Sequence, residues 1–137
     1  MDHVPDVLTW RRRIWVWGPA VLQMAVIFGF SGMPDIGRLP GGVSDLTAHF
    51  AGYGLLGALV VRAVGGARWA GVTPSAAARA WLISAAYGVS DEFHQSFVPG
   101  RSPNVIDWVA DAAGAAVAIS AVVLGARLVR RAKGREV

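Results

Sequence analysis

Four long apolar runs dominate the chain and restrict the folds open to it. They cover residues 14–31, 45–65, 73–97 and 104–130. The hydrocarbon core of a bilayer is about 30 Å thick, so a helix that crosses it needs roughly 20 mostly apolar residues. Hydrophobic residues make up 54% of the chain, more than the roughly 45–50% of typical soluble domains. Because lipid offers no water to backbone groups, each run must be helical. We therefore predict an all-α fold, an integral membrane four-helix bundle.

Helix-start signals precede three of the runs. Ser44 stands before the second run, where its hydroxyl can accept a hydrogen bond from an otherwise unpaired amide. Thr73 is a similar cap, and Pro74 follows it at a position where a missing amide donor is tolerated. Asn104 opens the fourth run, and Asp107 three positions later resembles a capping box. These signals predict where the helices begin.

The first run has two interpretations, a signal peptide or a permanent span. It is longer than a typical signal core, and the segment "FGFSGMP" has no small-x-small cleavage pattern. We therefore expect a permanent span, with Pro19 near its start and Pro34 just beyond its end.

Basic residues predict the orientation of the bundle, since cytoplasmic loops retain Lys and Arg. With the N-terminus inside, all but two of the 13 Lys and Arg residues lie in the cytoplasm, and only Arg38 and Arg101 lie outside. Both termini are then cytoplasmic. The predicted organisation is a cytoplasmic N-terminal segment (1–13), a membrane domain (14–130) and a basic cytoplasmic tail (131–137).

Composition also excludes several classes of function. The sequence pI is about 10.7, yet the basic residues flank apolar runs instead of forming a stripe with interleaved aromatics, so no nucleic acid partner is expected. Cysteine is absent, which excludes a disulfide framework, a thiol nucleophile and a thiolate metal site. The expected partner is the lipid bilayer.

Polar residues converge at the predicted outer end of three helices. A charge near the centre of a spanning helix costs roughly 2.5–3.5 kcal/mol, so a deep acid such as Asp111 should face protein or a wet cavity. Residues four apart share a helix face, and small residues below the acids suggest a close helix contact under a polar pocket. Periodicity does not choose between the adjacent acids of the third helix. The converging residues are Asp45, His49, Asp91, Glu92, His94, Gln95, Asp107 and Asp111.

Two segments carry a family resemblance. "SDLTAHFAGYGLLG" and "YGVSDEFHQSFVPGRSPNVIDWVADAAG" resemble the VanZ-like family of small bacterial membrane proteins, over about residues 26–125. Two positions depart from the family pattern. Leu46 stands where a lysine is often found, and Asp111 stands where an asparagine is common. The family motif falls on Ser44, Asp45, His49, Tyr53, Glu92, Gln95, Pro99, Gly100, Arg101, Asp107, Asp111 and Gly114.

The resemblance implies which residues form the site. It favours Glu92 over Asp91, and it ranks His94 below His49. We expect His49, Glu92 and Asp107 to be catalytic if the protein is an enzyme, a question the sequence leaves open. Arg101 is expected close to Asp107 or Glu92, either as a structural clamp or as a grip on a phosphate or carboxylate. The expected ligand-binding residues are Asp45, Tyr53, Gln95, Arg101 and Asp111.

Metal and acyl-transfer chemistry have no motif in the sequence. His49, Glu92, Asp107 and Asp111 are chemically suitable metal ligands, but no compact ligand spacing joins them. We expect no metal and no other cofactor. No G-x-S-x-G nucleophile motif occurs, whereas crowded, desolvated carboxyl groups are suited to general acid–base chemistry.

The functional prediction is a multi-pass protein of the bacterial cytoplasmic membrane. Its outward-facing polar pocket is expected to bind or modify a cell-envelope component, such as an envelope lipid or a peptidoglycan-related ligand. The resemblance implies a link to resistance to glycopeptides such as teicoplanin. One alternative is a small proton-coupled transporter. The position of the acids argues against it, because they cluster at one membrane face instead of the midplane. Another is a structural bundle without catalysis. The oligomeric state is left open.

Overall fold

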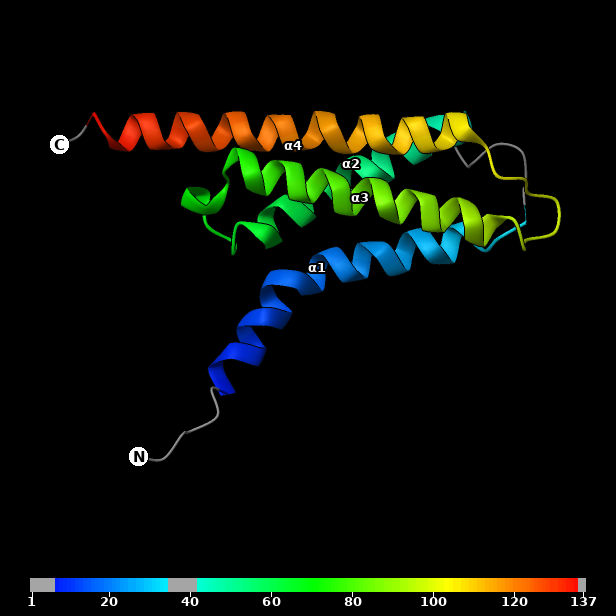
Figure 1. The fold of residues 1–137 in the computed structure, drawn as a ribbon, viewed down its shortest axis with the longest axis horizontal. Coiled ribbons are helices and arrows are strands. Elements are labelled where there is room, and N and C mark those ends of the chain that lie inside the picture. The colour runs from blue at the N-terminus through cyan, green and yellow to red at the C-terminus, as the bar shows by residue number, and fades with distance from the viewer. Residues whose placement is uncertain (1–6, 35–41, 136–137) are drawn as a thin grey trace.

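The computed structural model describes residues 7–34 and 42–135, and this part of the chain is helical throughout apart from its connections (Figure 1). No strand occurs among the described residues, so the predicted all-α class with four long helices is confirmed. Arg38 lies outside the described residues. The elements are α1 (Val7–Ser31), α2 (Asp45–Val64), the 3-10 helix η2 (Trp69–Gly71), α3 (Pro74–Gln95) and α4 (Val105–Lys133).

The three predicted helix caps are present. The Ser44 hydroxyl accepts a hydrogen bond from the backbone amide of Thr47 at 3.2 Å. The Thr73 hydroxyl accepts one from the Ala76 amide at 3.1 Å, directly before Pro74. The Asn104 side chain accepts one from the Ile106 amide at 3.0 Å. Each cap satisfies an amide that has no partner inside its helix, which is why α2, α3 and α4 begin where they do.

Helix α1 differs from the sequence prediction at its start. It begins at Val7, so the helix includes the three consecutive arginines that we expected to precede it. Pro19 is consequently the central residue of a 25-residue helix and not a residue of its first turn. A proline inside a helix removes one hydrogen bond and clashes with the preceding turn. Figure 1 shows α1 bent near its middle, as this effect requires.

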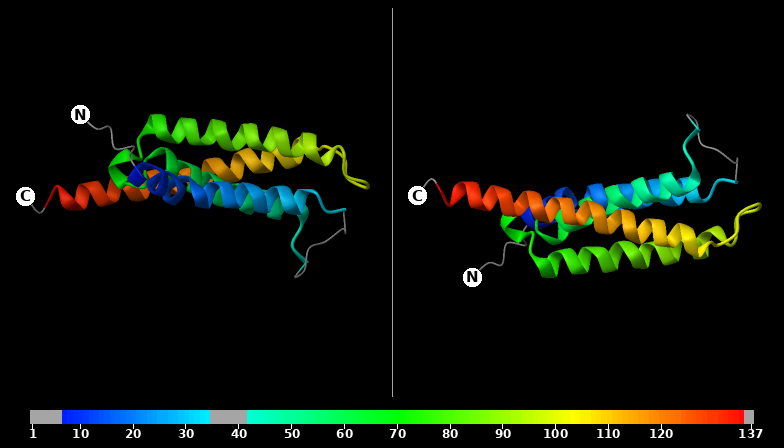
Figure 2. Two further views of the ribbon diagram at one scale, coloured as in Figure 1. Left: turned by 90° about the horizontal axis from the view of Figure 1, so that it is seen from below. Right: turned by 90° about the horizontal axis from the view of Figure 1, so that it is seen from above.

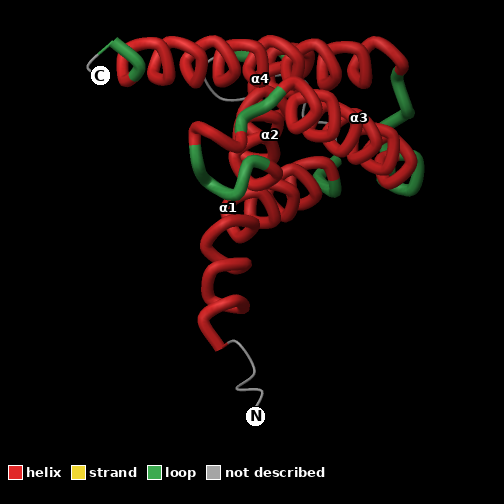
Figure 3. The backbone as a smooth tube through the Cα atoms, turned by 60° about the vertical axis from the view of Figure 1, so that its left-hand side comes forward, coloured by secondary structure: helices red, strands yellow, loops and turns green. Residues whose placement is uncertain are grey.

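The helices run alternately up and down the bundle, and the start of α1 lies at the same end as the end of α4 (Figures 1 and 2). Helices α2 and α4 form the most extensive contact, and Figure 3 shows α4 along the top with α2 below it. Small residues permit this contact. A Cβ atom added to Gly57 would lie 2.9 Å from Cα of Ala115, and one added to Gly114 would collide with the Phe50 carbonyl oxygen. The predicted close contact below the acids is therefore confirmed.

Three of the helices, α1 from Trp10 onward, α2 and α4, are long and apolar enough to cross a membrane. Their outer surfaces are apolar: Trp15, Leu22 and Leu128 are 70%, 66% and 56% exposed. Exposed apolar surface of this extent indicates contact with lipid. Helix α3 has 22 residues but carries more polar side chains, and it is not among the three. Its role as a fourth span remains a prediction.

Candidate functional site

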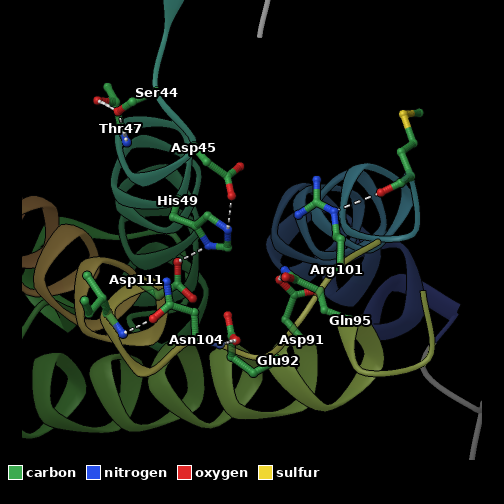
Figure 4. Close-up of polar contacts among 12 residues, drawn as sticks. Ser44, Asp45, Thr47, His49, Asp91, Glu92, Gln95, Arg101, Asn104 and Asp111 are labelled. Carbon is green, nitrogen blue, oxygen red and sulfur yellow. Dashed lines mark hydrogen bonds and ion pairs between the residues drawn. The ribbon is translucent and has the colours of Figure 1, made fainter. Parts of the chain in front are cut away.

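Polar side chains gather at the end of the bundle where α2 and α4 begin and α3 ends (Figure 4). Asp45 and His49 come from the first turns of α2, and Asp107 and Asp111 come from the first turns of α4. The last turn of α3 supplies its acids and Gln95. The buried members are His49, Asp91, Glu92, Gln95 and Asp111.

His49 lies at the centre of this group. Its Nδ1 atom is 2.9 Å from Oδ1 of Asp111, a hydrogen bond between α2 and α4. Its Nε2 atom is 3.9 Å from Oδ2 of Asp45, one turn earlier on α2. The Asp111 side chain is fully buried, whereas that of Asp45 is 52% exposed. The imidazole therefore connects a buried carboxylate with one at the surface.

The structure distinguishes the two adjacent acids of α3. Asp91 and Glu92 are both buried, but Asp91 accepts a hydrogen bond from Gln95 at 3.4 Å within its own helix. Glu92 offers a carboxylate oxygen within 4.8 Å of ligand atoms of His49 and Asp111. The residue favoured by the family resemblance is thus the one that meets His49.

Glu92 also changes the expected capping arrangement of α4. Its Oε2 atom accepts a hydrogen bond from the backbone amide of Asn104 at 2.6 Å. In a capping box this amide bonds to the side chain three residues later, which is Asp107 here. The partner instead comes from α3, so the predicted capping box is wrong in its second half. Because a sequence motif describes only local partners, it does not detect this contact between helices.

Gly88 allows α3 to approach α4 beside the acids. A Cβ atom added to Gly88 would lie 3.2 Å from Oδ2 of Asp111 and 3.1 Å from Cδ1 of Trp108. Trp108 in turn donates its indole N–H to the Ala85 carbonyl of α3 at 3.0 Å. A larger residue at position 88 would push these groups apart, so the glycine determines how closely the two helices pack.

Arg101 does not occupy the predicted position. Its Nε atom donates a hydrogen bond to the Met33 carbonyl oxygen, just beyond α1, at 2.9 Å. Among residues 7–34 and 42–135, it forms no ion pair with Glu92 or Asp107. The expected clamp on these acids is therefore wrong in this structure. The reason is the path of the loop between α3 and α4, which carries Arg101 toward α1.

Two further predicted residues, Tyr53 and His94, lie near the polar group around His49. Tyr53 is buried one turn below His49 on α2, and its hydroxyl has no hydrogen-bond partner among the described residues. His94 stacks on Phe28 of α1, with ring centroids 4.0 Å apart. The lower rank given to His94 agrees with this position, because its ring packs against α1.

Two sets of side chains could hold a metal ion. In each set the ligand atoms lie within 4.8 Å of one another. The inner set is His49, Glu92 and Asp111, all buried, and the outer set is Asp45, His49 and Asp107. Each set spans at least two helices, which is why the sequence has no compact ligand spacing.

Two hollows of the surface lie away from the polar group. One is lined by residues at the opposite end of the bundle, including Trp17, Arg79 and Ile83. The other is an apolar groove between α2 and α4, lined by residues such as Leu46 and Ile106. Neither includes His49, Glu92 or Asp111.

The fold is an all-helical bundle with helices long and apolar enough to cross a membrane and a polar group at one end. These features define a helical membrane protein, and comparison with known protein families identifies its family. The family model VanZ/LLP1 matches residues 46–126. The chain belongs to this family, as the resemblance predicted. No curated protein and no solved structure matches the chain.

Proposed function

We propose that this VanZ-like protein binds or modifies a cell-envelope component at the polar end of its bundle, and that this activity is linked to glycopeptide resistance. The proposal includes a location in the bacterial cytoplasmic membrane with this end facing outward. The ligand is an envelope lipid headgroup or a peptidoglycan-related molecule.

The contact of His49 with both Asp45 and Asp111 carries this proposal. A purely structural buried pair needs no connection to the surface, yet the His49 ring lies between an exposed carboxylate and a fully buried one. An imidazole in this position can accept a proton on one nitrogen and release one from the other. A ligand bound at the exposed rim could exchange protons with His49 in this way.

The rim offers charges of both signs. Two acids form one side of the rim: Asp45 is exposed and Asp107 is half-buried. Arg101 lies across from Asp45 in the view of Figure 4. Carboxylates bind ammonium and hydroxyl groups, and a guanidinium binds phosphate or carboxylate groups through two hydrogen bonds. A headgroup or peptide with both kinds of substituent matches this rim.

Glycopeptide susceptibility in a bacterium that expresses the chain tests the proposal. We expect the wild-type protein to reduce susceptibility to teicoplanin. His49→Ala and Arg101→Ala should abolish that protection at equal membrane abundance. His94→Ala and Arg79→Ala are matched controls, because His94 packs against Phe28 and Arg79 bonds locally to Ser75 at the other end of α3; both should retain protection.

Two results would contradict the proposal. If His49→Ala and Arg101→Ala remained folded and protected as well as the wild type, a structural bundle would be the better account. The purified protein could also move protons across vesicle membranes. If this proton flux, and no binding activity, followed teicoplanin protection across the variants, the protein would be a transporter.

A further inference from the structure

We propose that His49, Glu92 and Asp111 bind one divalent transition-metal ion between α2, α3 and α4. The sequence predicts no metal here, because no compact ligand spacing joins these residues. The proposal does not depend on the nature of the envelope ligand.

Ligand chemistry and spacing both favour the site. The three residues supply one imidazole nitrogen and two carboxylate oxygens, all within 4.8 Å of one another. Zn²⁺ binds such atoms at about 2.0–2.2 Å, so one ion joins ligand atoms that are up to roughly 4.4 Å apart. Side-chain rotations would have to bring all three atoms within that reach. An imidazole with two carboxylates suits Zn²⁺, Mn²⁺ or Fe²⁺.

Two buried carboxylate oxygens favour a cation at this site. Asp111 is fully buried and Glu92 is 9% exposed. Oδ2 of Asp111 and Oε1 of Glu92 accept no hydrogen bond from the described residues. Burying an anionic oxygen without a partner is strongly unfavourable. Two ionised carboxylates beside a neutral imidazole carry two negative charges, which one divalent cation balances.

One oxygen of Glu92 is already held. Glu92 Oε2 accepts a hydrogen bond from the Asn104 amide at 2.6 Å, and a hydrogen bond of this kind orients a metal ligand. The free oxygen of Glu92 is thus held in position while its partner oxygen is occupied. His49 Nδ1 lies 2.9 Å from Asp111 Oδ1; because a nitrogen that binds a metal carries no proton, an ion at Nδ1 would take the place of this hydrogen bond.

The inner set is favoured over the outer set by burial. Asp45 is exposed and Asp107 is half-buried, so water already solvates their charges and an ion there gains less. The inner acids lack that solvation. This difference makes the choice between the two sets testable.

Zinc binding by the full-length chain is the test. The protein is purified in detergent with a tag that contains no histidine, stripped with a chelator and titrated with ZnCl₂ in a calorimeter. We expect about one Zn²⁺ per chain by elemental analysis after desalting. Glu92→Gln should lower the affinity by at least about 10-fold, because loss of a direct ligand exceeds the effect of losing a group that merely orients one.

Glu92→Gln is the informative variant because its amide oxygen can still accept the Asn104 amide, so the fold has the best chance of surviving. Its folding is checked by size-exclusion chromatography and thermal unfolding. Asp45→Asn and His94→Ala are the controls, and both should retain one Zn²⁺.

Three results would overturn the metal proposal. The wild-type chain could bind no Zn²⁺, Mn²⁺ or Fe²⁺, in which case protons balance the buried acids. Glu92→Gln could bind zinc as tightly as the wild type. Asp45→Asn could lose zinc while Glu92→Gln retains it, which would assign the ion to the outer set. The susceptibility assay does not measure metal, so the proposed function can fail or succeed independently.

Discussion

Nδ1 of His49 lies 2.9 Å from Oδ1 of Asp111, and this hydrogen bond joins residues that are 62 positions apart in the chain. Both residues are buried, and they link the first turns of α2 and α4, the two helices with the most extensive contact. The bond therefore ties the polar group to the main packing interface of the bundle.

Removing His49 alone should be more harmful than removing the pair. His49→Ala leaves the fully buried Asp111 carboxylate without its partner, and breaking a buried pair in this way costs about 3–5 kcal/mol of unfolding free energy. Adding Asp111→Ala removes the stranded charge, so the double variant should recover part of the loss. Reversible unfolding in mixed micelles, with chelator present, measures the four free energies. If the double variant is less stable than His49→Ala, the bond is not the source of the loss.

Two glycines of α4 should respond oppositely to alanine. Gly114→Ala places a methyl group against the Phe50 carbonyl oxygen, and such overpacking costs about 1–3 kcal/mol. Gly125 has nothing within 4 Å of an added Cβ, so Gly125→Ala should be neutral or stabilise the helix by up to about 1 kcal/mol. Thermal unfolding of the two variants decides the point. Equal stabilities would mean that α2 and α4 are farther apart than described.

Glu92 should protect the Asn104 amide from exchange with solvent. Glu92→Ala removes the acceptor, and a hydrogen bond to a charged group contributes about 1.5–3 kcal/mol. Glu92→Gln retains an oxygen there and should have a smaller effect. Hydrogen–deuterium exchange of the segment that begins α4 is the measurement. Ser44→Ala, which removes the cap of α2, is the control and should leave that segment unchanged.

Replacing Pro19 should straighten α1. Pro19→Ala restores the missing amide donor at the centre of the helix, and a straight helix would separate positions 10 and 30 by about 30 Å. The chain has no cysteine, so Trp10→Cys and Phe30→Cys accept spin labels specifically. Electron paramagnetic resonance should report a longer distance in Pro19→Ala than with Pro19 present. Gly18→Ala is the control. Position 18 already has a backbone amide donor, so this substitution should not lengthen the distance between the two labels.

Local signals in the sequence determined much of the fold. The apolar runs predicted four helices, and Ser44, Thr73 and Asn104 located three helix starts, because a cap bonds only to amides two or three residues away. The spacing of acids along each helix also predicted which end of the bundle is polar. The start of α1 is the exception, because the apolar run predicts only the apolar part of the helix, whereas long charged side chains such as those of the three arginines can continue a helix into the aqueous interface.

Which polar side chains meet between helices was decided by tertiary structure. Periodicity left Asp91 and Glu92 equivalent, since both lie near one face of α3; the rotation of α3 against α4, set by close approach at Gly88, brings Glu92 to His49 and Asp111. Arg101 turned toward Met33 and away from the acids. The sequence by itself determined that four long helices form, where three of them begin, and that their acids gather at one end of the bundle, because those properties depend on near neighbours. Which acids meet depended on how whole helices rotate and pack, and that is a property of the folded chain.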